Sequence, residues 1–397
     1  MPGGSGAAQA HDVIVVGLGG MGSAVAAQLA ARGFRVLGIE RHGLAHNLGS
    51  SHGESRIIRQ AYFDGPAYVP LLLRAYQLWR ELETSTGTSL LTKTGGLMLG
   101  PQGSRTVSGS LESAKAWGID HELLDAVEIA RRWPALSPAP DDVALYETDA
   151  GFVRAEATVS AQLALARHHG AQLHFNEVVT GWGTTTSGAE VVTELGRYHG
   201  ARLVLAPGAW APQILGRLGL PFAVERHVQF WLRPTVPVER FFPDVQPIYV
   251  WEDAEGTQAY GFPALGREKD GVKAALFRGG APAEPDHLER TVDPEEAAPL
   301  LEFLSPRLPA LGPEVCAAVA CMYTTTPDEH FVLGFAPGDE LVVICSPCSG
   351  HGFKFVPVVG EVAADLVASS GTNLDISLFD PARFSRTSVA VDDRSQE

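Results

Sequence analysis

Residues 12–40 read DVIVVGLGGMGSAVAAQLAARGFRVLGIE, and this stretch decides the fold. The apolar run 13–16 predicts a buried parallel strand. A glycine-rich turn follows, then a helical pattern that stops at Gly33 and a second strand that ends in Glu40. Strand, glycine turn, helix, strand and acid in this order form the dinucleotide-binding fingerprint in its full context. The stretch therefore predicts a Rossmann-like nucleotide-binding fold.

Three glycines in this turn have separate tasks. Gly17 allows the tight turn, Gly19 lets the backbone approach a pyrophosphate, and Gly22 lets the helix lie close to the strand. The helix N-terminus offers N–H groups and a partial positive charge to phosphates, and Glu40 can accept hydrogen bonds from ribose hydroxyls. The alternative is a glycine-rich turn that only packs. The stretch alone leaves open whether the dinucleotide is NAD or FAD.

Composition limits the class of protein. With 397 residues, two domains are expected, and 45% hydrophobic residues are typical of a globular chain. The net charge of −16 argues against nucleic acid or an anionic membrane as a partner. No apolar run is long enough to span a membrane, residues 1–10 lack the features of a secretory signal, and four cysteines do not make a disulfide framework. A cytoplasmic protein is expected.

The order of elements predicts an α/β (mixed α+β) fold. A strand at 201–205 breaks into a small-residue turn, APGAW, which suggests a second approach of backbone to the cofactor. Short strand-like pieces separated by Pro and Gly predict a mostly antiparallel sheet inserted into the nucleotide-binding fold; they are 228–232, 248–251, 258–262 and 272–277. The expected domains are a Rossmann-like nucleotide-binding domain built from discontinuous segments (11–90, 145–220 and 321–385), a substrate domain (91–144 and 221–320), and disordered tails (1–10 and 386–397).

A pair of arginines follows the loop after Glu40. Arg56 and Arg59 are three residues apart, and this spacing predicts that they share one face of a helix. They are either solvated charges or a cationic pair that faces a cofactor or an anionic substrate group. Residues 68–83 predict an amphipathic helix.

Four stretches carry a resemblance to a known family: VIVVGLGGMGSA near the N-terminus, GSSHGESRIIRQAY with YVPLLLRAYQLW (49–62 and 68–79), CMYTTTPDEHF (321–331) and SGHGFKF (349–355). The chain resembles the monomeric sarcosine oxidase and N-methyltryptophan oxidase family, which belongs to the D-amino-acid-oxidase-like FAD amine oxidases. The resemblance implies FAD as the cofactor, with Glu40 on the adenosine ribose.

The resemblance also implies a covalent flavin. Cys321, directly before Met322 and Tyr323, matches the cysteine that forms a thioether with the flavin 8-methyl carbon; from the residues alone it reads as a small buried apolar side chain. The remaining cofactor-binding residues that the resemblance implies are Gly17, Gly19, Gly22, Arg41, Ser50, Ser51, His52, Arg56, Val178, Gly208, Gly350, Gly352, Phe353 and Lys354.

Cationic side chains receive roles from the same resemblance. It implies that Arg56 lies against the flavin ring, that Arg59 and Lys354 hold the substrate carboxylate, and that Lys273 activates dioxygen. A fixed guanidinium fork with a point charge suits a carboxylate in a dry pocket. From the residues alone, Lys273 reads as a solvated residue on a strand.

Three more side chains, Tyr260, Tyr323 and His351, match positions in or near the family's substrate cavity. His351 could equally be a satisfied histidine of a loop. In the family, a histidine follows four residues after the lysine that corresponds to Lys273, and this chain has Phe277 at that position. The pocket is therefore expected to be more apolar than in a sarcosine oxidase, and a bulkier or more apolar N-alkyl amino acid becomes a plausible substrate.

Cys345 and Cys348 form a CxxC pair, which is found in redox and zinc sites. No second CxxC or histidine pair completes a zinc site in this sequence. Two small buried thiols are the ordinary interpretation.

The sequence thus predicts a monomeric FAD-dependent oxidase of a secondary, N-methyl or cyclic, α-amino acid. Dioxygen would be the acceptor, and the products would be an imine or formaldehyde, an amino acid and hydrogen peroxide. The alternatives are a cyclic imino-acid oxidase of a biosynthetic pathway, and a flavin-carrying electron-transfer protein without oxidase activity. The expected partners are a small amino acid and dioxygen, with no metal, nucleic acid or membrane.

Overall fold

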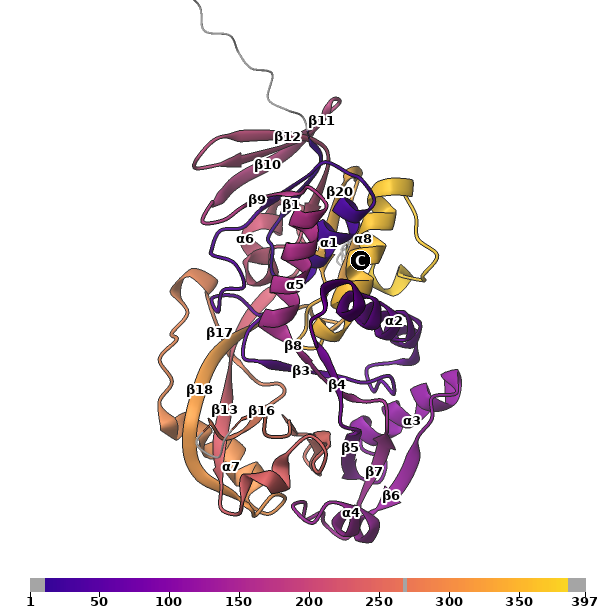
Figure 1. The fold of residues 1–397 in the computed structure, drawn as a ribbon, viewed down its shortest axis with the longest axis vertical. Coiled ribbons are helices and arrows are strands. Elements are labelled where there is room, and N and C mark those ends of the chain that lie inside the picture. Colours follow the sequence, from indigo (N-terminus) through magenta and orange to yellow (C-terminus); the bar gives the residue numbers. More distant parts are fainter. Residues whose placement is uncertain (1–10, 267–269, 385–397) are drawn as a thin grey trace, which may run out of the picture. The chain divides into compact units, whose positions relative to one another are not determined.

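The computed structural model describes residues 11–266 and 270–384, and Figure 1 shows their helices and strands. The chain divides into two compact units, neither of which is continuous in sequence. Within the described residues, the first unit contains 11–52, 156–224 and 324–384, and the second contains 53–155, 225–266 and 270–323. The predicted disordered tails lie outside the described residues. The predicted division into a nucleotide-binding domain and a substrate domain, with the ranges given above, stays a prediction.

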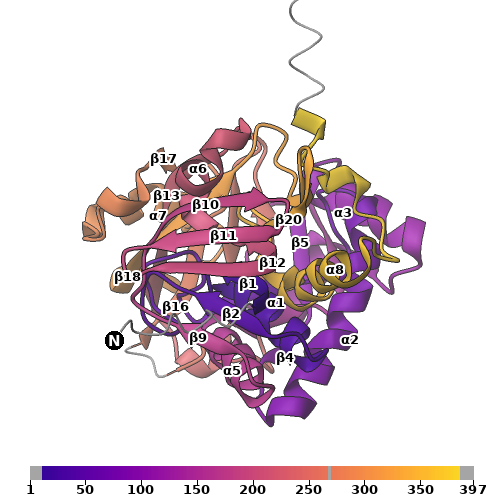
Figure 2. The ribbon, with the colours of Figure 1, turned by 90° about the horizontal axis from the view of Figure 1, so that it is seen from above.

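The first unit is built on one twisted sheet. Its strands are β1 (His11–Val16), β2 (Val36–Ile39), β9 (Gln172–His174), β10 (Val179–Thr185), β11 (Gly188–Thr193), β12 (Arg197–Leu205), β19 (Val332–Ala336) and β20 (Asp339–Ser346). Seen from above, strands β10, β11, β12, β1, β2 and β9 lie side by side in this order (Figure 2). The pairs β1–β2, β1–β12, β2–β9 and β12–β20 are parallel. The predicted Rossmann-like sheet is therefore present, with β1 at its centre.

Four helices complete this unit: α1 (Gly20–Ala31), α5 (Ala155–His168), α6 (Ala211–Leu215) and α8 (Val356–Ser369). Buried apolar strand residues such as Ile14, Leu37 and Leu203 form its core. Helix α1 packs against α8, and this contact needs a glycine, because a Cβ at Gly360 would lie 2.7 Å from the Cβ of Ala24. The two helices can approach closely only because neither has a large side chain there.

The second unit contains two sheets. Its strands are β3 (Ser55–Ile58), β4 (Leu91–Lys93), β5 (Gly96–Pro101), β6 (Glu122–Asp125), β7 (Asp142–Glu147), β8 (Gly151–Arg154), β13 (Ala223–Pro234), β14 (Ile248–Glu252), β15 (Gln258–Gly261), β16 (Val272–Leu276), β17 (Ala281–Pro282) and β18 (Leu311–Thr325). The larger sheet has the order β17-β13-β16-β15-β14-β5-β7-β6, with β18 beside β13, and the smaller one has the order β3-β8-β4. Apart from the parallel pair β14–β5, the described ladders of this unit are antiparallel. The mixed fold class is confirmed.

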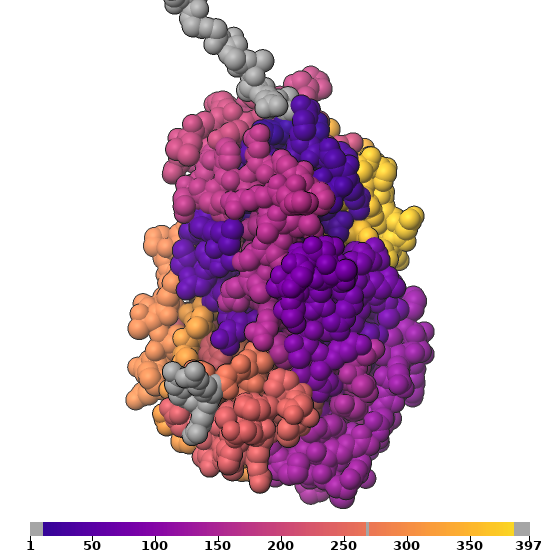
Figure 3. Space-filling model, viewed as in Figure 1, coloured from indigo at the N-terminus to yellow at the C-terminus, as the bar shows by residue number. Residues whose placement is uncertain are grey.

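The helices of the second unit are α2 (Val69–Thr86), α3 (Arg105–Trp117), α4 (Ala126–Arg132) and α7 (Ala298–Leu304). Helix α2 is amphipathic as predicted, with Leu71, Ala75, Leu78 and Leu82 buried at helical spacing. Its opposite side lies at the surface in the face shown in Figure 3. It ends at Gly87, whose φ of 64° few other residues adopt.

The helical spacing assigned to Arg56 and Arg59 is wrong. Residues 55–58 form strand β3, which pairs with β8, so Arg56 lies in a strand and Arg59 follows its end. The β-branched pair Ile57 and Ile58 favours this strand, and that local preference prevails over the spacing of the charges.

None of the helices in the described ranges has both the length and the apolar character that crossing a membrane requires.

Candidate active site

The turn after β1 forms a cradle in the first unit. Gly17 has a φ of 85°, and a Cβ at Gly22 would overlap the carbonyl oxygen of Gly17. Gly19 differs, because a Cβ there would meet only Ser51 Oγ, at 3.6 Å. Ser51 Oγ accepts a hydrogen bond from the N–H of Gly20, the first residue of α1, at 3.1 Å. The backbone beside Gly19 is thus left uncovered at a helix N-terminus, which fits the diphosphate of a dinucleotide.

Glu40, at the end of β2, is buried and holds the same turn. Its Oε2 accepts the N–H of Leu18 at 2.8 Å, and its Oε1 accepts the N–H of His42 at 3.0 Å. His46 Nε2 lies 3.2 Å from Oε1. Burial acts to raise the pKa of Glu40, but the hydrogen bonds from His46, Leu18 and His42 outweigh it and lower the pKa. The carboxylate is therefore ionised at neutral pH and fixes the turn, and its contact with a nucleotide stays a prediction.

Other predicted cofactor residues of this unit lie around the cradle. Arg41 packs its guanidinium over the ring of Trp210 at 4.5 Å, and His52 is buried. The carbonyl of Gly208 accepts a hydrogen bond from Thr324 Oγ1 at 3.2 Å. Ser50 and Val178 lie in the connections after β2 and β9. Their contacts with a cofactor stay a prediction.

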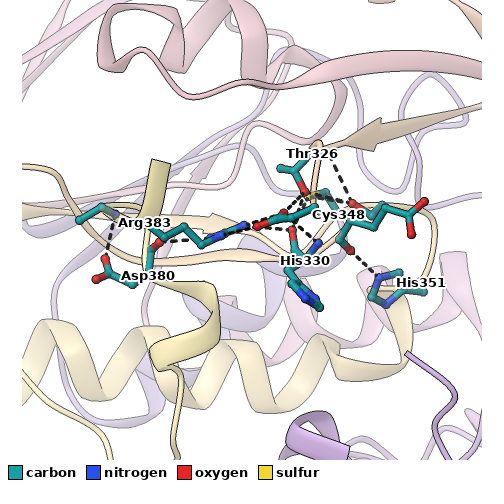
Figure 4. Close-up of polar contacts among 10 residues, drawn as sticks. Thr326, His330, Cys348, His351, Asp380 and Arg383 are labelled. Carbon is teal, nitrogen blue, oxygen red and sulfur yellow. Dashed lines mark hydrogen bonds and ion pairs between the residues drawn. The ribbon is translucent and has the colours of Figure 1, made fainter. Parts of the chain in front are cut away.

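The loop 349–355 connects β20 with α8 in the same unit. His351 Nε2 lies 3.1 Å from the carbonyl oxygen of Glu329 (Figure 4). The side chain is buried, and its ring stacks on Phe331 at 4.8 Å. Lys354 is buried as well, and its Nζ donates to the carbonyl of His351 at 2.7 Å. His351 thus has a structural role in the loop, and its role in a substrate cavity stays a prediction.

Glycines let this loop fold tightly. Gly350 has a φ of 80°, and a Cβ at Gly352 would overlap the carbonyl oxygen of Pro347. Phe353 begins a short 3-10 turn (Phe353–Phe355), and its ring is one of the atoms that a Cβ at Gly20 would touch, at 3.0 Å. The predicted loop residues and the glycine turn after β1 are therefore neighbours.

An ion pair joins the segment after α8 to the turn at residues 326–330, which lies beside Cys348. Arg383 Nε donates to Asp328 Oδ2 at 2.8 Å, and Thr326 Oγ1 donates to the carbonyl of His330 at 2.8 Å (Figure 4). Cys348 Sγ lies 3.8 Å from the same carbonyl. Burial raises the pKa of Cys348 to about 11, and burial raises that of Cys345 too. Redox thiols need a lowered pKa, so the interpretation as two buried thiols is favoured.

Lys273, Arg56 and Cys321 come together in the second unit. Lys273, on β16, is only 3% exposed, and its Nζ donates to the carbonyl oxygens of Ser55 (2.9 Å) and Gly53. The interpretation of Lys273 as a solvated residue is wrong. Arg56 Nη1 donates to the same Ser55 carbonyl at 2.9 Å, and its Nη2 lies 3.9 Å from Cys321 Sγ. Two cations and a thiol therefore share one small region.

An aromatic cluster lies beside these groups. Tyr260 Oη and Tyr323 Oη are 3.5 Å apart, and both rings contact Phe277 edge-on. Phe63 and Val250 complete an apolar patch around Phe277. Burial raises the pKa of both tyrosines, so both phenols stay neutral. The expectation of an apolar surface at Phe277 agrees with this packing.

Arg59 is a second buried cation of this unit. It is 3% exposed, and its guanidinium lies over the rings of Tyr62 (4.6 Å) and Phe63 (4.1 Å). Within the described residues, its Nε and Nη2 have no hydrogen-bond acceptor; the carboxylate of Asp64 lies 3.7 Å from Nη2. Buried N–H groups without an acceptor cost free energy, so a planar anion is the natural ligand.

Sequence reasoning missed three residues around these groups. Glu147 accepts hydrogen bonds from the backbone after Arg59, and Asp64 lies beside the Arg59 guanidinium. His227, on β13, stacks on the Tyr323 ring at 3.8 Å, and its Nε2 lies 3.0 Å from Glu225 Oε2. All three are acidic or aromatic residues in strands or turns without a motif. No motif marks them: Glu147 and His227 meet Gln60, Ala61 and Tyr323 far along the chain, and Asp64 lies in a turn next to Arg59.

Comparisons with known proteins define the class. A family model described as FAD dependent oxidoreductase matches residues 12–366. The chain belongs to this family of FAD-dependent oxidoreductases, and FAD is its cofactor. The open cradle beside Gly19 and the buried Glu40 fit the nucleotide half of that cofactor.

Within the family, the chain is 52% identical to the monomeric sarcosine oxidase of Streptomyces avermitilis, over 94% of this chain and 97% of that one. It is 35% identical to the N-methyl-L-tryptophan oxidase of Salmonella typhimurium, over 95% of this chain and 100% of that one. The resemblance stated from the sequence is confirmed.

Solved structures show the same fold. NikD, an unusual amino acid oxidase essential for nikkomycin biosynthesis, matches with a TM-score of 0.81 at 28% identity, over 94% of this chain and 97% of that one. The L-proline dehydrogenase from P. horikoshii matches with a TM-score of 0.79 at 25% identity, over 96% of this chain and 99% of that one. The chain is therefore a flavin-dependent oxidoreductase by fold and by sequence.

Proposed function

We propose that this enzyme oxidises the C–N bond of a secondary α-amino acid, N-methyl or cyclic, with dioxygen as the electron acceptor. The observation that carries the proposal is Arg59, a buried cation on two aromatic rings. Its Nε and Nη2 have no hydrogen-bond acceptor among residues 11–266 and 270–384. This arrangement suits the carboxylate of an amino acid. The similarity to sarcosine and N-methyltryptophan oxidases supports the same substrate class.

FAD, when bound, supplies the two-electron oxidation that turns the amine into an imine. The imine then takes up water and, for an N-methyl substrate, releases formaldehyde and the primary amino acid. The two electrons and two protons reduce dioxygen to hydrogen peroxide. We propose that Gly17, Gly19, Gly22 and Glu40 hold the adenosine and diphosphate, and that Ser51 orients the first turn of α1.

Arg59 and Lys354 are proposed as the two cations for the substrate carboxylate. Both side chains are buried, and each lies against aromatic rings, Tyr62 and Phe63 for Arg59 and Phe355 for Lys354. Water is kept away from such cations, which strengthens their interaction with an anion. We expect Arg59→Met and Lys354→Met each to raise KM for the amino acid by about tenfold or more, which corresponds to about 1.4 kcal/mol.

Lys273 is proposed as the group that speeds the reaction with dioxygen. Its ammonium is held by the carbonyls of Gly53 and Ser55 and shielded by Trp231 and Phe262. A fixed positive charge in a dry site stabilises negative charge that develops on reduced oxygen. In Lys273→Met, we expect reoxidation of the reduced enzyme to slow by about a hundredfold or more, while anaerobic reduction by the substrate changes far less. Stopped-flow absorbance of the two half-reactions checks this, and equal slowing of both would contradict it.

Cys321 is proposed as the site of covalent flavin attachment. The thiol is buried, with the Arg56 guanidinium 3.9 Å from its sulfur. After denaturation and filtration, the yellow colour should stay on the wild-type protein and pass through the filter for Cys321→Ala. Release of all colour from the wild type would refute the attachment.

A panel of substrates with a peroxide assay tests the proposed function. It should contain sarcosine, N-methyl-L-tryptophan, other N-methyl amino acids and cyclic imino acids, with their primary amino acids as controls. Because Phe277 and Val250 make the cluster apolar, we expect kcat/KM to rise for bulkier apolar N-methyl substrates relative to sarcosine.

Two outcomes of that panel favour other functions. Peroxide from cyclic imino acids alone would favour a biosynthetic imino-acid oxidase, a reading that the similarity to NikD supports. Reduction by substrate followed by slow reoxidation in air would favour an electron-transfer role. We also propose that the enzyme acts as a monomer in the cytoplasm.

A further inference from the structure

Glu147, the last residue of β7, is a buried acid that no motif marks. It is 1% exposed, and both of its oxygens accept backbone hydrogen bonds. The N–H of Gln60 lies 2.9 and 3.0 Å from Oε1 and Oε2, and the N–H of Ala61 lies 2.8 Å from Oε2. A carboxylate that accepts several N–H groups in a buried site fixes that backbone.

The fixed backbone is the segment that follows Arg59. Strand β3 pairs with β8 up to the partners Ile58 and Gly151, and the ladder ends there. Beyond this point the Glu147 side chain takes the place of a neighbouring strand for Gln60 and Ala61. Arg59 is therefore held between the end of a sheet and a carboxylate.

The same segment supplies the contacts of the Arg59 side chain. Tyr62 and Phe63 form the two rings on which its guanidinium lies, and Asp64 is 3.7 Å from its Nη2. A shift of residues 60–64 would move all three neighbours at once. Glu147, by holding the first two amides of this segment, sets the position in which Arg59 meets a ligand.

The pKa of Glu147 is close to neutral pH. Burial is the largest influence and raises its pKa to about 7, against the lowering effects of the Ala61 and Gln60 amides and of the Arg59 charge, and Asp149 raises it further. Tyr76, from α2, is the other titratable group that interacts with it, and burial raises the pKa of this phenol well above its usual range. Asp64 differs from Glu147, because Arg105 (3.2 Å) and Arg278 (3.4 Å) add to Arg59 as partners of its carboxylate.

We propose that Glu147 is a positioning residue for Arg59 and that the binding of a carboxylate at Arg59 is coupled to the uptake of a proton by Glu147. This inference rests on the proposed function, in which Arg59 binds the substrate carboxylate. A bound anion offsets the attraction of Arg59 for the Glu147 carboxylate and adds a second negative charge. Both effects favour the neutral acid.

Calorimetry of ligand binding to the holoenzyme measures the proton. The probe is (methylthio)acetate, in which sulfur replaces the nitrogen of sarcosine, so it has a carboxylate and no amine that titrates. Titrations near pH 7 in two buffers of different ionisation enthalpy should show uptake of a fraction of a proton by the wild type. Its affinity should rise as the pH falls from about 8 to about 6, by less than about tenfold per pH unit, the limit for one coupled proton.

Three variants assign the proton. Glu147→Gln should lose the uptake and the slope of affinity against pH. Asp149→Asn, an exposed neighbour that pairs with Lys93, should keep both. Asp64→Asn should keep the uptake as well. Uptake that survives in Glu147→Gln, or that disappears only in Asp64→Asn, would overturn the proposal. Absence of uptake by the wild type would overturn it even if Glu147→Gln does not fold.

Steady-state kinetics test the positioning. Glu147→Gln should raise KM for an N-methyl amino acid several-fold with a smaller change in kcat, and should leave turnover of an N-methyl amine without a carboxylate unchanged. Equal losses for both substrates would indicate a general structural role and overturn the positioning. Absence of peroxide from every N-methyl amino acid with the wild type would instead refute the proposed function, while proton uptake with (methylthio)acetate would still stand as evidence for Glu147.

Discussion

Gly19 and Gly22 lie three residues apart in one turn but meet different surroundings. A Cβ at Gly22 would overlap the Gly17 carbonyl, whereas a Cβ at Gly19 has only Ser51 nearby, at 3.6 Å. We expect Gly22→Ala to destabilise the protein by about 1–3 kcal/mol or more, because the turn must open. Gly19→Ala should keep the melting temperature of the apoprotein and lower flavin content. Thermal unfolding and the absorbance ratio of flavin to protein separate the two, and equal stability losses would contradict the assignment.

His227 gives a second test at the scale of one residue. Its ring stacks on Tyr323 at 3.8 Å, and Tyr323 faces Tyr260 in the aromatic cluster. Removing the ring in His227→Ala should cost about 0.5–1.5 kcal/mol of stacking and lower kcat/KM by about threefold to tenfold. His227→Phe keeps a ring and should recover most of the activity. Failure of this rescue would show that the imidazole nitrogens, rather than the stack, matter.

Single residues show where prediction from sequence succeeds and fails. The glycine turn and Glu40 were predictable, because their roles follow from local geometry. The burial of Lys273 was not predictable, because its acceptors Gly53 and Ser55 lie about 220 residues away in the chain, at the start of β3. His227 and Glu147 were missed for the same reason, since Tyr323, Gln60 and Ala61 are also distant from them in the chain.

The corner formed by β3, β7 and β8 should make stability depend on pH. The pKa of Glu147 is raised from 4.5 to about 7 in the folded protein. The folded state therefore binds this proton more tightly than the unfolded state does, so its stabilising effect is complete below about pH 4.5 and is lost as the pH rises through about 7. The loss is up to about 3 kcal/mol. Glu147→Gln should lose this part of the slope of melting temperature against pH, and an unchanged slope would contradict the assignment.

Elements with a clear period or clear end signals were predicted well. Helix α2 and the strands of the parallel sheet match the expected positions, because buried apolar residues recur at the right spacing. Strand β18 was missed, although it runs over Leu311–Thr325. It contains Pro313 and many small residues, and it pairs only with β13 at the edge of its sheet, where a proline is tolerated. Tertiary pairing, rather than local preference, makes it a strand.

The two units have separate cores, so a truncation can test their independence. A chain that ends at Tyr323 lacks β19, β20 and α8, and α1 then loses the helix against which it packs. We expect this chain to retain no flavin and to lose the cooperative unfolding of the first unit. Flavin absorbance and the sharpness of thermal unfolding measure this. A truncated chain that binds FAD would show that the cradle after β1 is sufficient.

Over the whole molecule, the sequence indicated the class of fold, and the ranges of the predicted domains stay a prediction. The fingerprint and the change from parallel-strand to antiparallel-strand patterns were enough for a discontinuous Rossmann-like unit with an inserted sheet. Strand β18 continues without a break past the point where the chain passes from the second unit to the first, so no local pattern marks that point.

The position of β20 and α8 in the chain has a consequence during synthesis. The central strand β1 is synthesised more than three hundred residues before β20, which pairs with β12 in the same sheet. The neighbours of β1 in the sheet, β2 and β12, are made by residue 205, but the face of α1 that packs on α8 stays uncovered until residues 356–369 have been made. We expect this uncovered apolar face to make the nascent chain prone to aggregation.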